Sequence, residues 1–199
     1  SGLLSAELLD GGYRVLGIDV SAAMIRLARQ KAREAKFRVS SAYDAELPQC
    51  GAVLAVGEPL NYLSDAETKK AHRRNLLRLF RKIYIALNLG GILIFDMAVP
   101  GLVPERETLK FFTEGKDWLI AGSSHEDAAT GVLTRRIITF RKSGRGYRRS
   151  DEVHRQALYP ASEITQELAK LGFSVRVSRQ YGRFRLLKSR AAFIARKEE

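Results

Sequence analysis

Three short apolar segments, separated by stretches with helical periodicity, constrain the fold of this chain more than any other feature. They are residues 13–18, 52–56 and 92–95, and aspartates directly follow the first and the last. A strand that is apolar throughout is typical of a parallel sheet covered on both faces. Strands that alternate with helices at this spacing predict a doubly wound, mostly parallel α/β sheet over residues 1–97.

Capping signals bound the helical stretches between these segments. Ser21 is a natural N-cap for a helix that follows the first strand. A long amphipathic helix is expected over residues 65–88, ended by Gly90-Gly91. On this helix His72 lies among lysines and arginines, which favours a solvated side chain.

After Pro100 the composition changes. Residues 111–159 are rich in Thr, Phe, Ile, Trp and Arg, which predicts two or three antiparallel strands over residues 111–123, 132–142 and 147–158. A helix beginning near Pro160 and two final strands follow. Because halves of a 199-residue chain would each have too little core, we expect one domain, 1–199. Its core would be residues 1–97 and 160–199, with residues 98–159 as a β-rich cover.

Composition narrows the class of protein. Cys50 is the only cysteine, which excludes an internal disulfide, and three scattered histidines do not make a metal site. No apolar run approaches the ~20 residues that span a bilayer, and no signal peptide is visible, so a cytoplasmic protein without a membrane partner is expected.

The chain is strongly basic, with 34 Lys and Arg against 22 Asp and Glu and a formal net charge of +12. Such an excess is compatible with a nucleic-acid partner. The basic residues are scattered along the sequence, however, which favours a solvated basic surface instead.

Asp19 is the first residue with recognisable chemistry. In a doubly wound sheet, ligands bind beyond the carboxyl ends of the strands. A carboxylate there can accept both hydroxyls of an adenosine ribose, from S-adenosylmethionine or from a nicotinamide cofactor. It can equally serve only as a cap for the following helix.

The residues around Asp19 resemble the class I S-adenosylmethionine-dependent methyltransferases. Ser1-Gly2 resembles the end of that family's G-x-G-x-G loop, and residues 15–29 resemble its acidic strand end with the continuation D-x-S-x-x-M. The resemblance continues through residues 57–63, 90–96 and 163–173 and is loose over 98–159. It implies a Rossmann-like, doubly wound fold in which the β-rich insertion lies on the substrate side.

In that family a strand precedes the glycine-rich loop, and the sequence here supplies only the last two loop residues. We therefore expect residues 1–199 alone to bind S-adenosylmethionine poorly.

The resemblance also implies a cofactor site. Gly2 would lie against the cofactor, Asp19 would hold the ribose hydroxyls, and Val20 and Met24 would pack on the adenine, although Met24 can equally be core. The segment that flanks the adenine edge would be Ser41, Ala42 and Tyr43, and the residues beside the methionine end would be Val56, Gly57 and Glu58.

Glu58, Asn61 and His154 are the candidates for catalysis on the substrate side. A carboxylate at a strand end can orient a nucleophile or act as a general base. The alternative is that Glu58 only hydrogen-bonds the cofactor or nearby backbone. His154, together with Tyr159, could face the pocket from the β-rich segment, although such residues on a strand are more often packing groups.

The expected activity is methyl transfer from S-adenosylmethionine to an N, O or C nucleophile of a small molecule. Gly57-Glu58-Pro59-Leu60 differs from the Asn/Asp-Pro-Pro-Tyr pattern of enzymes that methylate base amino groups. Two alternatives remain: an RNA or protein methyltransferase, which the net charge would suit, and a non-catalytic binding module built on the same fold.

Overall fold

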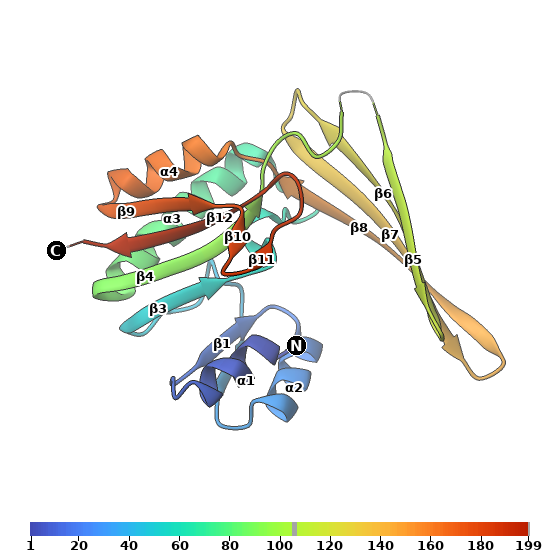
Figure 1. Cartoon of the computed structure of the whole chain (residues 1–199), viewed down its shortest axis with the longest axis horizontal. Coiled ribbons are helices and arrows are strands. Elements are labelled where there is room, and N and C mark those ends of the chain that lie inside the picture. The colour runs from blue at the N-terminus through green and yellow to red at the C-terminus, as the bar shows by residue number, and fades with distance from the viewer. Residues whose placement is uncertain (105–106, 199) are drawn as a thin grey trace. The chain divides into compact units, whose positions relative to one another are not determined.

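The computed structural model describes residues 1–104 and 107–198, which form two compact units, Ser1–Pro48 and Gln49–Glu199. Figure 1 shows the elements of both units in chain order.

The first unit consists of two helices and a parallel pair of strands. Its elements are α1 (Leu3–Asp10), β1 (Leu16–Asp19), α2 (Ala22–Lys31) and β2 (Lys36–Val39). The pair ends in register, with Asp19 beside Val39. As expected, Ser21 caps α2, because its hydroxyl accepts a hydrogen bond from the Met24 amide at 3.3 Å. Both strands of this unit therefore end at one edge.

The second unit is built on a four-stranded sheet in the order β3-β4-β12-β9. Its strands are β3 (Cys50–Ala55), β4 (Leu87–Ala98), β9 (Phe173–Ser178) and β12 (Arg190–Lys197), and the short strands β10 (Gln180–Tyr181) and β11 (Phe184–Arg185) form a hairpin beside it. β3 and β4 are parallel, whereas β12 is antiparallel to both of its neighbours. Three of these four strands therefore run in one direction and β12 runs against them.

Two helices, α3 (Lys69–Ala86) and α4 (Ala161–Lys170), accompany this sheet, and the short helix η1 (Pro59–Asn61) connects β3 to α3. Phe80 of α3 contacts Phe95 of β4, whose ring stacks on Phe193 of β12 at 4.7 Å. All three side chains are fully buried. Burial of large aromatic surfaces is the main term that stabilises such a core.

The second unit also contains a second four-stranded sheet, which is entirely antiparallel (Figure 1). Its strands are β5 (Leu109–Gly115), β6 (Trp118–Asp127), β7 (Val132–Ser143) and β8 (Gly146–Ala157). The prediction of a β-rich segment is confirmed, but the prediction of a single strand over 111–123 is wrong. The chain turns at Lys116-Asp117, and β5 pairs with β6 as a hairpin.

The long helix also differs from its predicted bounds. Its N-cap is Thr68, and Ala86 is its last residue. Gly90 and Gly91 do not end it, because β4 already begins at Leu87. A side chain at Gly91 would lie 2.8 Å from the Asn88 carbonyl oxygen, so this glycine permits close backbone packing within the strand instead.

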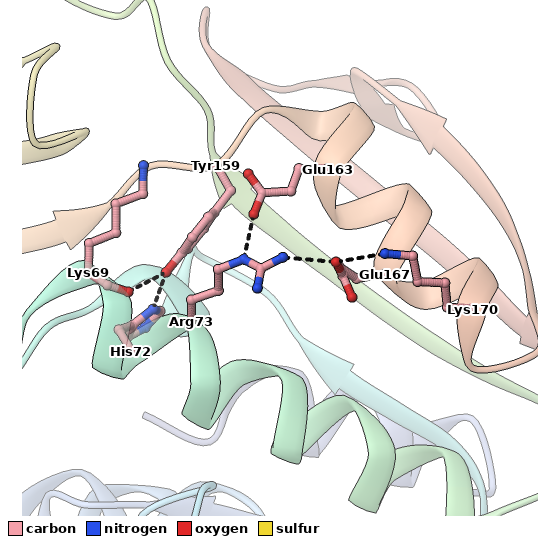
Figure 2. Close-up of polar contacts among 7 residues, drawn as sticks. All are labelled: Lys69, His72, Arg73, Tyr159, Glu163, Glu167 and Lys170. Carbon is pink, nitrogen blue, oxygen red and sulfur yellow. Dashed lines mark hydrogen bonds and ion pairs between the residues drawn. The ribbon is translucent and has the colours of Figure 1, made fainter.

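His72 is buried, so the prediction of a solvated side chain is wrong. Its Nδ1 lies 2.8 Å from the Tyr159 hydroxyl, which also donates a hydrogen bond to the Lys69 carbonyl oxygen (Figure 2). The basic neighbours of His72 point away from the core, whereas His72 is on the face of α3 that carries Leu76 and Leu79. Burial lowers the pKa of His72, and the nearby Glu67 carboxylate opposes this only in part.

Candidate functional site

In the first unit, the predicted cofactor residues lie at the carboxyl edge of β1 and β2. Asp19 accepts a hydrogen bond from the Ser21 amide through Oδ1 at 2.8 Å. Within the described residues, Oδ2 accepts none, so this oxygen can still bind the hydroxyls of a ligand. Val20 and Met24 are 71% and 40% exposed. Met24 is therefore not a core residue, and both side chains offer an apolar surface beside a carboxylate.

Ser41, Ala42 and Tyr43 follow β2 at the same edge. The Ser40 amide donates a hydrogen bond to the Asp19 carbonyl oxygen at 3.0 Å, which ties the two strand ends together. The Ser41 hydroxyl accepts from the Tyr43 amide at 3.1 Å and so shapes a tight turn. An acidic, an apolar and a polar group thus lie at one edge of the first unit.

Helix packing by itself explains why a glycine occupies position 2. Gly2 caps α1 with φ 81°, and a Cβ there would lie 2.6 Å from the Cα of Ala28 in α2. A side chain would therefore separate the two helices, quite apart from any contact with a cofactor.

In the second unit, Val56, Gly57 and Glu58 leave β3 at its carboxyl end. The Gly57 amide donates a hydrogen bond to the buried Asp96 carboxylate at 2.8 Å. The Tyr181 hydroxyl donates to the same oxygen at 3.1 Å, and burial, together with the charge of Asp96, raises the pKa of this phenol. Asp96 ends the apolar core of β4, so both parallel strands contribute polar groups at this edge.

Glu58 is the centre of a buried charged cluster. Its backbone has φ 63°, a left-handed conformation that a non-glycine residue adopts only when its surroundings hold it there. Its side chain is 3% exposed and forms ion pairs with Arg190 of β12 and with Arg135 of β7, the latter at 3.4 Å. The Gln156 side chain of β8 donates a hydrogen bond from Nε2 to Oε2 of Glu58 at 3.1 Å.

These contacts define what Glu58 can do. A carboxylate that already accepts from two guanidinium groups and an amide is held in one orientation by these contacts. Within the protein, the side-chain partners of Glu58 are Arg135, Arg190 and Gln156. They connect the end of β3 to β12 and to the antiparallel sheet.

Asn61 lies in η1 and is fully buried. Its amide nitrogen donates to the carbonyl oxygens of Ala98 and Ala157 at 3.0 and 2.7 Å, and its oxygen accepts from the Ala98 amide at 2.9 Å. The side chain thus joins the end of β4 to the end of β8. All of these partners are backbone groups, so the geometry supports a positioning role.

His154 is the most accessible of the three catalytic candidates. Its ring meets Tyr62 edge-on at 5.6 Å, and its Nε2 lies 3.2 Å from Glu152. It pairs in register with Arg135, and cross-strand partners share one face of a sheet. His154, Arg135 and Gln156 therefore lie on the same face of the antiparallel sheet.

Tyr159 is not beside His154, because it is buried against His72. Sequence reasoning missed Arg135, Arg190 and Gln156, which look like ordinary polar residues of exposed strands, and missed Asp96 and Tyr181 as a pair. Only the carboxylate at the end of β4 carried a usable signal, since strand ends of this kind bind ligands.

Two kinds of feature are absent from the part of the chain that the structure describes. Among the described residues, no group of three or more His, Cys, Asp and Glu side chains could hold a metal ion. Within those same residues, no helix is both long and apolar enough to cross a membrane.

Part of the chain resembles known methyltransferases in sequence. Residues 1–87 match the methyltransferase domain family. YqeM of Bacillus subtilis, whose name assigns it provisionally to the methyltransferases, is 25% identical over 187 residues, which are 88% of this chain and 70% of that protein.

Solved structures show the same fold. An S-adenosylmethionine-dependent methyltransferase from Clostridium acetobutylicum superposes with a TM-score of 0.78 at 16% identity, covering 94% of this chain and 76% of that one. The sugar N-methyltransferase KedS8 from Streptoalloteichus superposes with a TM-score of 0.70 at 20% identity, covering 92% and 71%. The chain is thus similar to S-adenosylmethionine-dependent methyltransferases in its Rossmann-like fold, and residues 1–87, which include Asp19, match the methyltransferase domain family in sequence.

Proposed function

We propose that this enzyme methylates an N, O or C nucleophile of a small molecule. The observation that carries the proposal is the cluster around Glu58, which joins the end of β3 to one face of the antiparallel sheet. That face carries His154 and Arg135. A sheet face so joined to the strand end can cover a small acceptor, and the sugar N-methyltransferase KedS8 shares this fold.

For the cofactor, the proposed binding residues are those at the two strand edges. Asp19 would accept the ribose hydroxyls through Oδ2, and Val20 and Met24 would contact the adenine. Gly2, Ser41, Ala42 and Tyr43 would complete this end, and Val56, Gly57 and Glu58 would lie beside the methionine end. The exposed Val20 and Met24 support the assignment, because exposed apolar groups beside a carboxylate suit a nucleoside.

On the substrate side, Glu58 and Asn61 would act as positioning residues and His154 as the group that can accept a proton. Methyl transfer needs above all an aligned nucleophile. Alignment can lower the activation barrier by about 7–11 kcal/mol at best. The engaged side chains of Glu58 and Asn61 favour alignment over proton transfer.

The same proposal includes the wider architecture. We propose one domain, with residues 1–97 and 160–199 as a doubly wound, mostly parallel core and residues 98–159 as its cover. The parallel pairs β1–β2 and β3–β4 support it. A cytoplasmic location fits the single free cysteine, Cys50.

Thermal unfolding of the natural full-length protein, with and without saturating S-adenosylhomocysteine, tests the cofactor assignment. Ligand at ~100 times its Kd adds about 2.7 kcal/mol, a shift of roughly 5–10 °C for a chain of this size. Asp19→Ala should abolish the shift, whereas Asp10→Ala, an exposed aspartate at the end of α1, should keep it. A folded protein without any shift would instead favour the non-catalytic binding module.

The acceptor class is tested by measuring S-adenosylhomocysteine release with amino sugars, phenols and carbon acids. His154→Gln should lower kcat more than KM if His154 accepts a proton. Turnover with RNA or a protein, and with none of the small molecules, would overturn the proposed substrate class.

A further inference from the structure

The outer face of α3 carries a row of basic side chains. Lys70, Arg74, Arg78 and Arg81 are all exposed and line an open groove together with Arg73 and Leu77. At 3.6 residues per turn these four fall within an arc of about 80°, opposite the buried face of the helix. Successive members are about 4.5–6 Å apart along the axis, and the row is about 16 Å long.

Among the described residues, none of these four cations forms an ion pair with an acidic side chain. Arg73, by contrast, is held by Glu163 and Glu167 of α4 at 2.7 and 2.8 Å (Figure 2). The sequence of α3 contains no aspartate or glutamate at all.

This arrangement does not stabilise the helix. Like charges three or four residues apart repel each other, and lysines in the first turn oppose the helix dipole. A face that only keeps a protein soluble is better served by alternating signs. The row of Lys70, Arg74, Arg78 and Arg81 is therefore better explained by an anionic partner than by solvation.

We propose that this row binds the phosphate backbone of RNA. Arginine presents a planar fork that matches phosphate oxygens, and an evenly spaced row follows a chain of phosphates. The arc also lacks the amide side chains that read bases, whereas RNA is bound largely through its shape and backbone.

This surface is independent of the identity of the methyl acceptor. The row begins at Lys70, near the start of α3, and runs along the helix toward β4. Its function is docking, so the test measures binding rather than methylation.

The experiment is fluorescence anisotropy of a labelled RNA hairpin titrated with the whole protein between 50 and 200 mM salt. Four phosphate contacts predict a slope of log K against log salt of about −2.8 to −3.6, a loss of about 50- to 150-fold over this range. Arg74→Gln/Arg78→Gln/Arg81→Gln should reduce the slope by about three.

A matched control removes three arginines elsewhere. Arg141→Gln/Arg145→Gln/Arg148→Gln changes the net charge equally in the exposed β7–β8 hairpin and should leave affinity and slope unchanged within about twofold. Far-UV circular dichroism and the Tm should show both variants folded, with the α3 variant at least as stable as the unchanged protein.

Three results would overturn the proposal. Equal losses in the two variants would mean that only net charge matters. Unchanged binding by the α3 variant would place RNA elsewhere. Stronger binding to duplex DNA, to an acidic peptide or to anionic vesicles than to the hairpin would mean that the row serves a different partner.

Discussion

At the scale of single residues, strain and charge concentrate at the end of β3. Glu58 combines a left-handed backbone with a buried carboxylate that binds Arg135 and Arg190. Each feature alone would cost stability, and together they connect the end of β3 to β12 and to the antiparallel sheet.

Asn61→Ala should destabilise the protein by about 2–4 kcal/mol. The change leaves three buried backbone groups of Ala98 and Ala157 without their partner. Urea unfolding measures the loss, and the exposed Asn88→Ala is the control, with an expected change within about 0.5 kcal/mol. A loss of activity without a loss of stability would contradict a positioning role and support direct catalysis by Asn61.

Gly2→Ala should destabilise the first unit by about 1–3 kcal/mol, because the new Cβ meets Ala28 and the backbone has a positive φ. Gly12→Ala is a matched control with φ 82° and no atom within 4 Å of the added Cβ, so it carries the conformational cost alone. Hydrogen exchange of α1 and α2 amides distinguishes the two. Equal effects would show that helix packing at Gly2 does not matter.

At the scale of elements, two contacts join α3 to α4 and to the segment that leads into it. Arg73 bridges Glu163 and Glu167, and His72 meets Tyr159 in the interior (Figure 2). The first contact is partly exposed and screened by solvent, so the buried pair matters more for stability.

The buried His72 should make stability depend on pH. Its pKa lies below the ordinary value of about 6.5 that it regains in the unfolded chain. Below that value the unfolded state binds more protons, so stability is complete above about pH 6.5 and falls as the pH drops through it.

Urea unfolding at pH 7.5, 6.5 and 5.5 measures this dependence, and His72→Gln should flatten it. His125→Gln, at an exposed histidine, should keep the slope of the unchanged protein. If His72→Gln retains the full slope, other groups cause the acid sensitivity.

At the scale of the whole molecule, the formal net charge of +12 opposes compaction. Salt screens repulsion between exposed charges beyond about 10 Å at 0.1 M. The Tm should therefore rise between 20 and 200 mM sodium chloride, and Arg74→Gln/Arg78→Gln/Arg81→Gln should show a smaller rise. A Tm that falls with salt would mean that attractive ion pairs outweigh the repulsion.

The sequence by itself determined the alternation of strands and helices, the cap at Ser21, the β-rich insertion and the family resemblance around Asp19. These depend on local periodicity, capping and turn chemistry, which act between residues a few positions apart. Even so, the hairpin at Lys116-Asp117 and the start of β4 at Leu87 escaped prediction, because pairing with neighbouring strands decided them.

Only the tertiary structure decided which polar side chains meet. Glu58 finds Arg135, Gln156 and Arg190 at separations of 77 to 132 positions in the chain, and no local pattern reports such contacts. The environment of His72 was not predictable from local sequence either: its charged neighbours favoured an exposed side chain, whereas His72 is buried in the core. Side-chain environment is a property of the packed chain, since burial and pairing arise from elements brought together across the fold.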